Sequence, residues 1–240
     1  MNKLDPRNIY DDLHQIPELG FEEFKTSAYL ADKLEAMGYK VTRNIGGTGV
    51  IGEIKGSEPG PVMMLRADMD ALPFLIDGEK KNIHACGHDA HSAMLLAAAS
   101  ELVGKVKRGT LRILFQQGEE TLKGALAVID AGVIEDVDIA LGLHIRPVQD
   151  IAYGEMSPAV RHASSTFVNV VINGLSSHGA RPHLGVNAIE AAAVAINAIT
   201  AIKINPIIPW SCKVTGIKGG GVAPNIIPDK VEMIVDARAQ

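Results

Sequence analysis

Three predominantly apolar runs constrain the fold of this chain more than any other feature. They are Val62–Leu65, Leu111–Phe115 and Asp138–Leu143. Runs without polar alternation are typical of strands that are buried on both faces. Helices are expected between them, at about 89–104 and 121–132, so strands and helices alternate along the chain. This order predicts an α/β fold in which a mainly parallel central sheet carries flanking helices on both faces.

Each apolar run ends in polar residues that could share one site. Asp68 and Asp70 follow the first run, Glu119 and Glu120 follow the second, and His144 follows the third. Ligand sites of open α/β sheets lie at the carboxyl ends of the strands. A charged residue after one strand usually belongs to a solvated loop, but three strands in succession indicate a functional site.

A dense cluster of metal-binding residue types, His84-Ala85-Cys86-Gly87-His88-Asp89-Ala90-His91, lies at the start of the helix expected at 89–104. Cysteine and histidine bind borderline-soft divalent metals. Asp89 is expected to cap this helix, which would place the cluster at a positive helix end. The alternative is that Cys86 is a small core residue and the histidines lie on the surface, which suits one histidine better than three.

Cys86, His88, Glu120 and His144 form a set of candidate metal ligands. Their mixture of sulfur, nitrogen and oxygen atoms favours zinc, manganese, cobalt or nickel over magnesium or calcium. Glu119 would then act as a general base on metal-bound water, whose pKa the metal lowers. Alternatively, the two glutamates stabilise the helix at 121–132 through its dipole.

A change of composition near 157–165 predicts a domain boundary. Beyond it, a strand at 167–173, a helix at 187–202 and strands near 212–218 and 230–237 are expected. This β-α-β-β order is part of a ferredoxin-like α+β unit, which would need one more helix and strand. The predicted domains are therefore 1–162 and 163–240, the second of them incomplete.

Several motifs together resemble the aminoacylase/carboxypeptidase family of amidohydrolases. These are dinuclear metallopeptidases that include hippurate hydrolases and indoleacetyl-amino-acid hydrolases. In chain order, the motifs are Leu13–Gly20, Arg66–Pro73, His84–His91, Phe115–Glu120, Gly142–His144 and Ser177–His183.

The resemblance implies hydrolysis of the amide bond of an N-acyl or aryl-acyl amino acid, or of a related peptide-like substrate, at two divalent metal ions (Zn, Mn, Co or Ni). By position, the metal ligands would be Cys86, His88, Glu120 and His144, and the general base Glu119. Asp70 and Asp89 would orient the metal ligands without binding the metal themselves. His178 matches a histidine that stabilises the oxyanion in the site of a partner subunit, and Asn225 matches a substrate contact.

The resemblance also implies a zinc-peptidase-like catalytic domain followed by a lid domain through which two copies dimerise. Relatives usually continue well beyond the position of Gln240 and supply a further histidine ligand. We therefore expect a C-terminal truncation that puts the activity of the 240-residue chain in question. The loop from Phe74 to Ile83 is expected to be shorter than in relatives. The alternatives are a dipeptidase or exopeptidase of the same clan, and an inert metal-binding or dimerisation module.

Composition narrows the expected partners and location. The chain is 47% hydrophobic, 21% charged and carries a net charge of −5, which is typical of a globular protein. It contains no basic run that predicts a nucleic-acid partner. It also contains no apolar run of the roughly 20 residues that would span a membrane. Two cysteines and a start without an apolar leader predict a cytoplasmic location.

Overall fold

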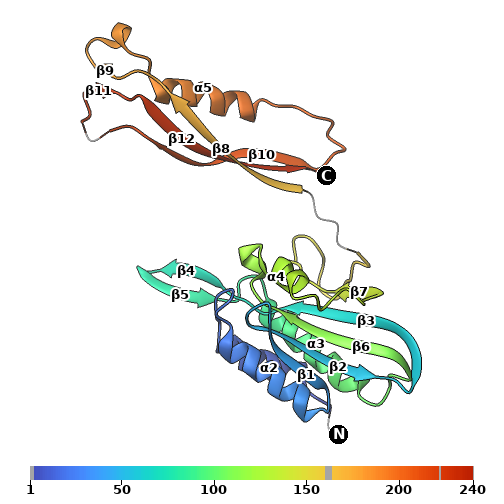
Figure 1. Ribbon diagram of the computed structural model, residues 1–240. Coiled ribbons are helices and arrows are strands. Elements are labelled where there is room, and N and C mark those ends of the chain that lie inside the picture. The colour runs from blue at the N-terminus through green and yellow to red at the C-terminus, as the bar shows by residue number, and fades with distance from the viewer. Residues whose placement is uncertain (1–2, 160–163, 222, 240) are drawn as a thin grey trace. The chain divides into compact units, whose positions relative to one another are not determined.

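The computed structural model describes residues 3–159, 164–221 and 223–239. The chain divides into two compact units, unit 1 over Met1–Tyr153 and unit 2 over Gly154–Gln240 (Figure 1). The boundary predicted between residues 162 and 163 lies outside the described residues.

Unit 1 is built on a five-stranded sheet with the strand order β1-β2-β6-β3-β7. The bounds are β1 (Lys40–Ile45), β2 (Gly49–Lys55), β3 (Glu58–Asp68), β6 (Arg108–Gln116) and β7 (Ile139–Gly142). β3 runs parallel to both β6 and β7, whereas β1–β2 and β2–β6 are antiparallel. The sheet is therefore mixed, and the prediction of a mainly parallel sheet is wrong for its β1–β2 side. The cause is local, because a three-residue turn joins β1 to β2 and so short a turn can join only antiparallel strands.

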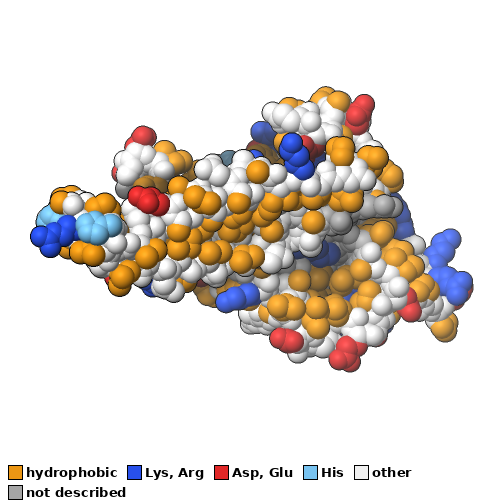
Figure 2. Space-filling view, turned by 90° about the horizontal axis from the view of Figure 1, so that it is seen from above, with side chains coloured by type: hydrophobic (Ala, Val, Ile, Leu, Met, Phe, Trp, Pro, Cys, Tyr) orange, Lys and Arg blue, Asp and Glu red, His pale blue; other side chains and the backbone are white. Residues whose placement is uncertain are grey.

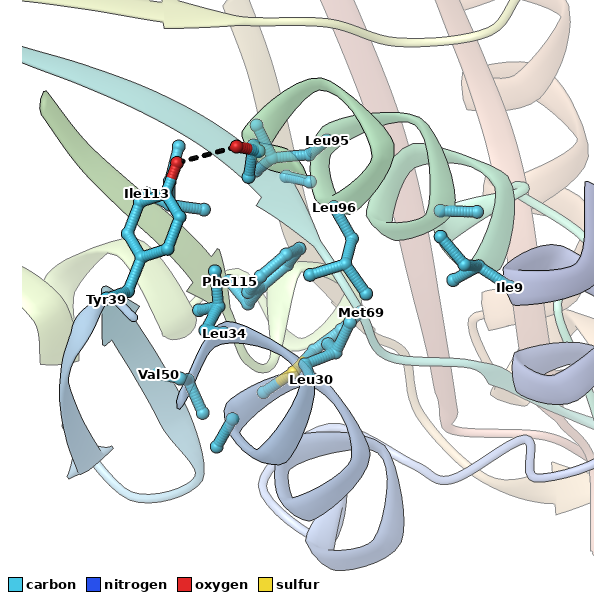
Figure 3. Close-up of a cluster of buried hydrophobic side chains, with 14 of the residues drawn as sticks. Ile9, Leu30, Leu34, Tyr39, Val50, Met69, Leu95, Leu96, Ile113 and Phe115 are labelled. Atoms are coloured by element: carbon cyan, nitrogen blue, oxygen red, sulfur yellow. Dashed lines mark hydrogen bonds between the residues drawn. The ribbon is translucent and has the colours of Figure 1, made fainter. Parts of the chain in front are cut away.

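Helices cover both faces of this sheet, as predicted. α1 (Pro6–His14), α2 (Phe24–Ala36) and α3 (His88–Leu102) pack on one face, and α4 (Gly124–Asp130) packs on the other. The larger core lies under the three helices, where Leu34, Leu96 and Phe115 are fully buried (Figure 3). The hydroxyl of Tyr39 donates to the carbonyl of Ala99 at 2.9 Å, which satisfies a polar atom at the edge of this core (Figure 3).

Residues 74–83, expected from the sequence to form a loop, belong to a β-hairpin of β4 (Leu72–Ile76) and β5 (Glu79–Ile83). Its turn consists of Asp77 and Gly78, both with positive φ, at 53° and 82°. This is the conformation that an Asp-Gly pair favours in a two-residue hairpin turn. The hairpin is therefore encoded locally, and it joins β3 to the segment that precedes α3.

Unit 2 has the β-α-β-β order expected from the sequence. β8 (Ser164–Asn173), β12 (Lys230–Ala239) and β10 (Trp210–Gly219) form an antiparallel sheet in the order β10-β12-β8. α5 (Ala188–Thr200) packs on one face of it through a core that includes Ala188, Ala192, Val231 and Met233. A separate pair, β9 (Ser177–His178) and β11 (Ile226–Ile227), lies beside the short 3₁₀ helix η2 (Pro182–Leu184).

Many apolar side chains remain on the surface of the molecule, as the orange areas of Figure 2 show. In unit 2 they include Phe167 and Val171 of β8, Val194 of α5 and Ile234 of β12. Among the described residues, no helix is both long and apolar enough to cross a lipid bilayer.

Candidate metal centre

The strand order brings the predicted site residues to one edge of the unit 1 sheet. β3, β6 and β7 are parallel neighbours, so their carboxyl ends share an edge. Glu119 and Glu120 follow β6 in the 3₁₀ helix η1 (Glu119–Thr121), and His144 follows β7. Cys86 and His88 reach the same place from the start of α3.

The four candidate ligands are close together. Cys86 Sγ lies 3.6 Å from His144 Nε2, and His88 Nε2 lies 3.8 Å from Glu120 Oε1. Potential ligand atoms of Cys86, His88 and His144 all lie within 4.8 Å of one another, and so do those of His88, Glu119 and Glu120. His88 belongs to both groups and therefore joins them into one cluster.

Gly87 allows the Cys86–His88 segment to approach the loop after β7. It adopts a φ of +83°, and a Cβ atom there would lie 2.2 Å from Cδ1 of Ile145. Both observations require glycine, because other residues rarely adopt this conformation and would collide with Ile145. The glycine also serves as the N-cap residue of α3.

Asp89 is not the N-cap of α3, and this part of the sequence prediction is wrong. Since Gly87 caps the helix, Asp89 falls in the first turn. One of its carboxylate oxygens lies 2.6 Å from His14 Nδ1, and the other accepts a bond from the Ala90 amide at 2.8 Å. Asp89 thus ties α3 to α1, and a negative charge in the first turn suits the helix dipole.

The hydrogen bonds of His88 leave one lone pair unused. Nδ1 lies 3.0 Å from Asp70 Oδ1 and donates to it. Within the described structure, the opposite nitrogen Nε2 and Glu120 Oε1 are both buried without a hydrogen-bond partner. Two buried acceptors that face each other are costly unless a positive charge lies between them. The donor atoms therefore fit a divalent cation.

His144 is oriented in the same manner. Its Nδ1 donates to the backbone carbonyl of Ile145 at 2.6 Å, which leaves Nε2 as the lone pair that faces Cys86. Metal-binding histidines usually donate their second ring nitrogen to a carboxylate or carbonyl in this way.

The pKa shifts of Cys86, Glu120 and His88 all favour the protonated form of the group. Burial raises the pKa of the Cys86 thiol to about 12, and the charges of Glu120 and Glu119 act in the same direction. Burial also raises the pKa of Glu120. For His88, burial favours the neutral ring, but the bond to Asp70 and nearby carboxylates outweigh it and raise the pKa. A bound cation would reverse the effect on the thiol and the carboxyl group.

Glu119 is the more open member of the glutamate pair. Its side chain is 39% exposed against 21% for Glu120, and its Oε2 lies 3.9 Å from His88 Nε2. This places a carboxylate at the edge of the cluster, where a water molecule could reach it. The arrangement is compatible with proton transfer by Glu119 and metal binding by Glu120.

Asp68 and His91 form a second buried group, to which the sequence assigned no role. Their ligand atoms also lie near His88, but both ring nitrogens of His91 already make hydrogen bonds. Nδ1 lies 2.5 Å from Asp68 Oδ1, and Nε2 accepts the Ile145 amide at 2.9 Å. Burial opposes the charge on Asp68, but the bond from His91 and the guanidinium of Arg66 hold its pKa well below the usual range. The sequence signal that could have identified Asp68 as a site residue is its position two residues before Asp70, which puts both side chains on the same side of the strand end.

His178 and Asn225 lie in unit 2, where the structure places them side by side. His178 pairs with Ile226 across β9 and β11, and the Gly179 amide donates to the Asn225 carbonyl at 2.7 Å. The Nδ1 of His178 accepts the Ala180 amide at 3.1 Å. The expected contacts of both residues with substrate stay predictions.

Comparisons with known proteins agree with these observations. The sequence model of Peptidase family M20/M25/M40 matches residues 64–228, a range that contains every candidate site residue. Thermostable carboxypeptidase 1 of Saccharolobus solfataricus is 38% identical, with 92% of this chain and 60% of that protein covered. Hippurate hydrolase of Campylobacter jejuni is 36% identical, with 96% of this chain and 63% of that protein covered.

A solved structure shows the same fold. The Bacillus subtilis YXEP protein, described as a dinuclear metal binding peptidase of the M20 family, superposes with a TM-score of 0.77 at 32% identity. The match covers 97% of this chain and 63% of that one. The chain thus spans about 60% of the length of its curated relatives. On the extent of the match to the family's sequence model, the chain belongs to Peptidase family M20/M25/M40.

Proposed function

We propose that this chain forms the metal centre of a hydrolase that cleaves the amide bond of N-acyl or aryl-acyl amino acids. The observation that carries the proposal is the pair of buried, unpartnered acceptors, His88 Nε2 and Glu120 Oε1, beside Cys86 and His144. Four acceptor groups of this kind suit zinc, manganese, cobalt or nickel. We propose two such ions, because the M20-family YXEP protein is described as dinuclear.

Bound divalent ions would supply an acidified water molecule and polarise the substrate carbonyl. The residues of this chain handle the protons. Glu119 accepts a proton from the attacking water and returns it to the nitrogen of the leaving amine, so the carbon–nitrogen bond breaks as the acid and the amine form. Asp70 holds the proton of His88 on Nδ1 and keeps Nε2 free.

The substrate class is supported by the relatives. Besides hippurate hydrolase, they include N-acetyl-L-cysteine deacetylase of Bacillus subtilis, 38% identical with 91% of this chain covered. A peptide substrate is the second candidate, and the similarity to thermostable carboxypeptidase 1 favours it. The two classes differ in the group on the acyl side of the scissile amide.

Unit 2 has a proposed role as lid and dimerisation domain of a cytoplasmic homodimer. Here His178 stabilises the oxyanion in the site of the second copy, and Asn225 contacts the substrate. The adjacency of these two residues in unit 2 supports a shared role.

Metal analysis combined with hydrolysis assays tests the proposal. The purified 240-residue chain should bind divalent metal and hydrolyse members of a panel of benzoylated, acetylated and dipeptide substrates. Glu119→Gln should abolish turnover and retain the metal, whereas Glu22→Gln, at an exposed carboxylate, should change neither. Metal binding without turnover on any substrate would indicate the inert module. Unchanged metal content in Cys86→Ala would refute the ligand assignment.

A further inference from the structure

His91 of α3 is fully buried, and both of its ring nitrogens are engaged. The Ile145 amide can only donate, so His91 Nε2 must be the acceptor of the 2.9 Å bond between them. The ring proton therefore resides on Nδ1, which donates to Asp68 Oδ1 at 2.5 Å. His91 is thus fixed as one neutral tautomer with no lone pair available for a metal ion.

Ile145 connects His91 to the candidate ligand His144. The Ile145 amide is bound by His91, and its carbonyl accepts the Nδ1 proton of His144 at 2.6 Å. The rings of His91 and His144 also pack edge to face, with centroids 4.4 Å apart at 61°. The position of His91 therefore determines the tautomer and orientation of His144 through the backbone of Ile145.

The hydrogen bonds that run from His144 through Ile145 and His91 end at Asp68, which is held at the end of a sheet strand. Arg66 Nη1 donates to Asp68 Oδ2 at 2.7 Å, and Ser92 Oγ donates to the Asp68 carbonyl at 2.8 Å. Asp68 itself is fully buried at the end of β3. By contrast, Leu143, Ile145 and Val148 in the loop after β7 are exposed, so packing restrains that loop weakly.

We propose that His91, held by Asp68 and Arg66, is a positioning residue that fixes His144 with its proton on Nδ1 and its Nε2 facing the metal. The inference rests on the proposed metal centre for its function, but the hydrogen-bond geometry exists without a metal. Asp68 and His91 therefore support the centre, and the group that they form with the ligand His88 is not a further ion site.

Nuclear magnetic resonance of the metal-free chain, labelled with ¹⁵N in its histidine rings, tests the positioning directly. Long-range proton–nitrogen correlations should show both His91 and His144 protonated on Nδ1. In His91→Asn, which cannot reach the Ile145 amide, His144 should become a mixture of tautomers. An Nε2-protonated or doubly protonated His91 would overturn the proposal, and so would an unchanged His144 in the variant.

Cobalt(II) titration tests the consequence for metal binding. The affinity of His91→Asn should fall about 10–100-fold, the usual effect of losing support behind a ligand. His91→Gln places its amide oxygen near the former Nε2 position and should recover most of the affinity. In a His144→Ala background, His91→Asn should cause no further loss, because its effect acts through His144.

The outcomes separate the two proposals. If the unsubstituted chain shows no thiolate-to-cobalt absorption, the metal centre is wrong, and the tautomer measurement still decides the positioning. If the chain binds cobalt but His91→Asn binds equally well, the positioning role is wrong. A loss that adds fully to that of His144→Ala would also contradict it. Circular dichroism verifies that each variant is folded.

Discussion

Asp70 touches two candidate ligands at once. Its Oδ1 accepts the Nδ1 proton of His88, and its Oδ2 accepts the backbone amide of Glu120 at 2.9 Å. In Asp70→Asn, the single amide oxygen cannot serve both donors. We expect metal affinity to fall about 10–100-fold and stability to fall by about 1–3 kcal/mol, because one buried donor loses its partner. Metal titration and urea unfolding measure the two effects, with Asp130→Asn at an exposed position as the control. Equal affinity in both variants would contradict the expectation.

Glu23 gives a pH dependence that can be assigned to one buried carboxyl group. It is fully buried, and it accepts bonds from the Thr48 hydroxyl and the Gly118 amide. Burial raises its pKa above the ordinary 4.5 despite these bonds. The folded state thus binds the proton more tightly than the unfolded state. The stability from this group is present at low pH and is lost as pH rises from about 4.5 through the folded pKa.

Glu23→Gln removes this titration and keeps the shape of the side chain. Between pH 5 and pH 8, the free energy of unfolding of the variant should improve relative to that of the unsubstituted chain. Urea unfolding at both pH values measures the difference. A constant difference would mean that Glu23 titrates normally in the folded state.

At the level of single residues, the sequence indicated which side chains lie together in the site but not which hydrogen bonds they form. Cys86, His88, Glu120 and His144 were predicted as one set and lie together in the structure. His91 was part of the predicted cluster without a role, since its partner Ile145 lies 54 residues later, just beyond the Gly142–His144 motif, and contributes only its backbone amide. Long-range bonds of this kind depend on strand order, which periodicity does not reveal.

At the level of elements, the junction before α3 depends on Gly87. Gly87→Ala would introduce both an unfavourable φ, costing about 1–2 kcal/mol, and a collision with Ile145. Gly78→Ala is the matched control, because Gly78 has a nearly equal φ of +82° and a Cβ atom there would meet nothing within 4 Å. We expect Gly87→Ala to be the more destabilised of the two and to lose metal affinity, whereas Gly78→Ala should bind metal normally. Thermal unfolding and metal titration make the comparison.

Most elements were predictable because each carries a strong local pattern. Apolar runs identified β3 and β6, and the strand–helix–strand alternation around 89–104 identified α3. The mixed character of the sheet was missed because an apolar run does not reveal the direction in which its strand pairs, here β6 antiparallel to β2 and parallel to β3. The β4–β5 hairpin was missed although its Asp-Gly turn was visible, because its two strands are largely exposed and lack a buried apolar face.

For the molecule as a whole, the buried clusters predict two separately stabilised units. The two clusters of unit 1 contain residues between 4 and 137, and the cluster of unit 2 contains residues from 170 to 233. Leu96→Ala should destabilise unit 1 by about 2–5 kcal/mol and leave hydrogen exchange in β12 unchanged. Met233→Ala should destabilise unit 2 and leave hydrogen exchange in β6 of unit 1 unchanged. A single unfolding transition that both substitutions shift equally would refute the independence of the two units.

The candidate ligands are also widely separated in chain order, since Cys86 and His144 are 58 residues apart. During translation at about 5–20 residues per second, the thiol emerges roughly 3–12 s before the last imidazole. In a zinc finger the ligands lie close together in the sequence. Here they do not, so the full ligand set is unavailable to an ion during most of the synthesis of this segment. If the proposed centre binds metal, we expect the ion to bind after the sheet has formed, so that this segment folds in its metal-free form.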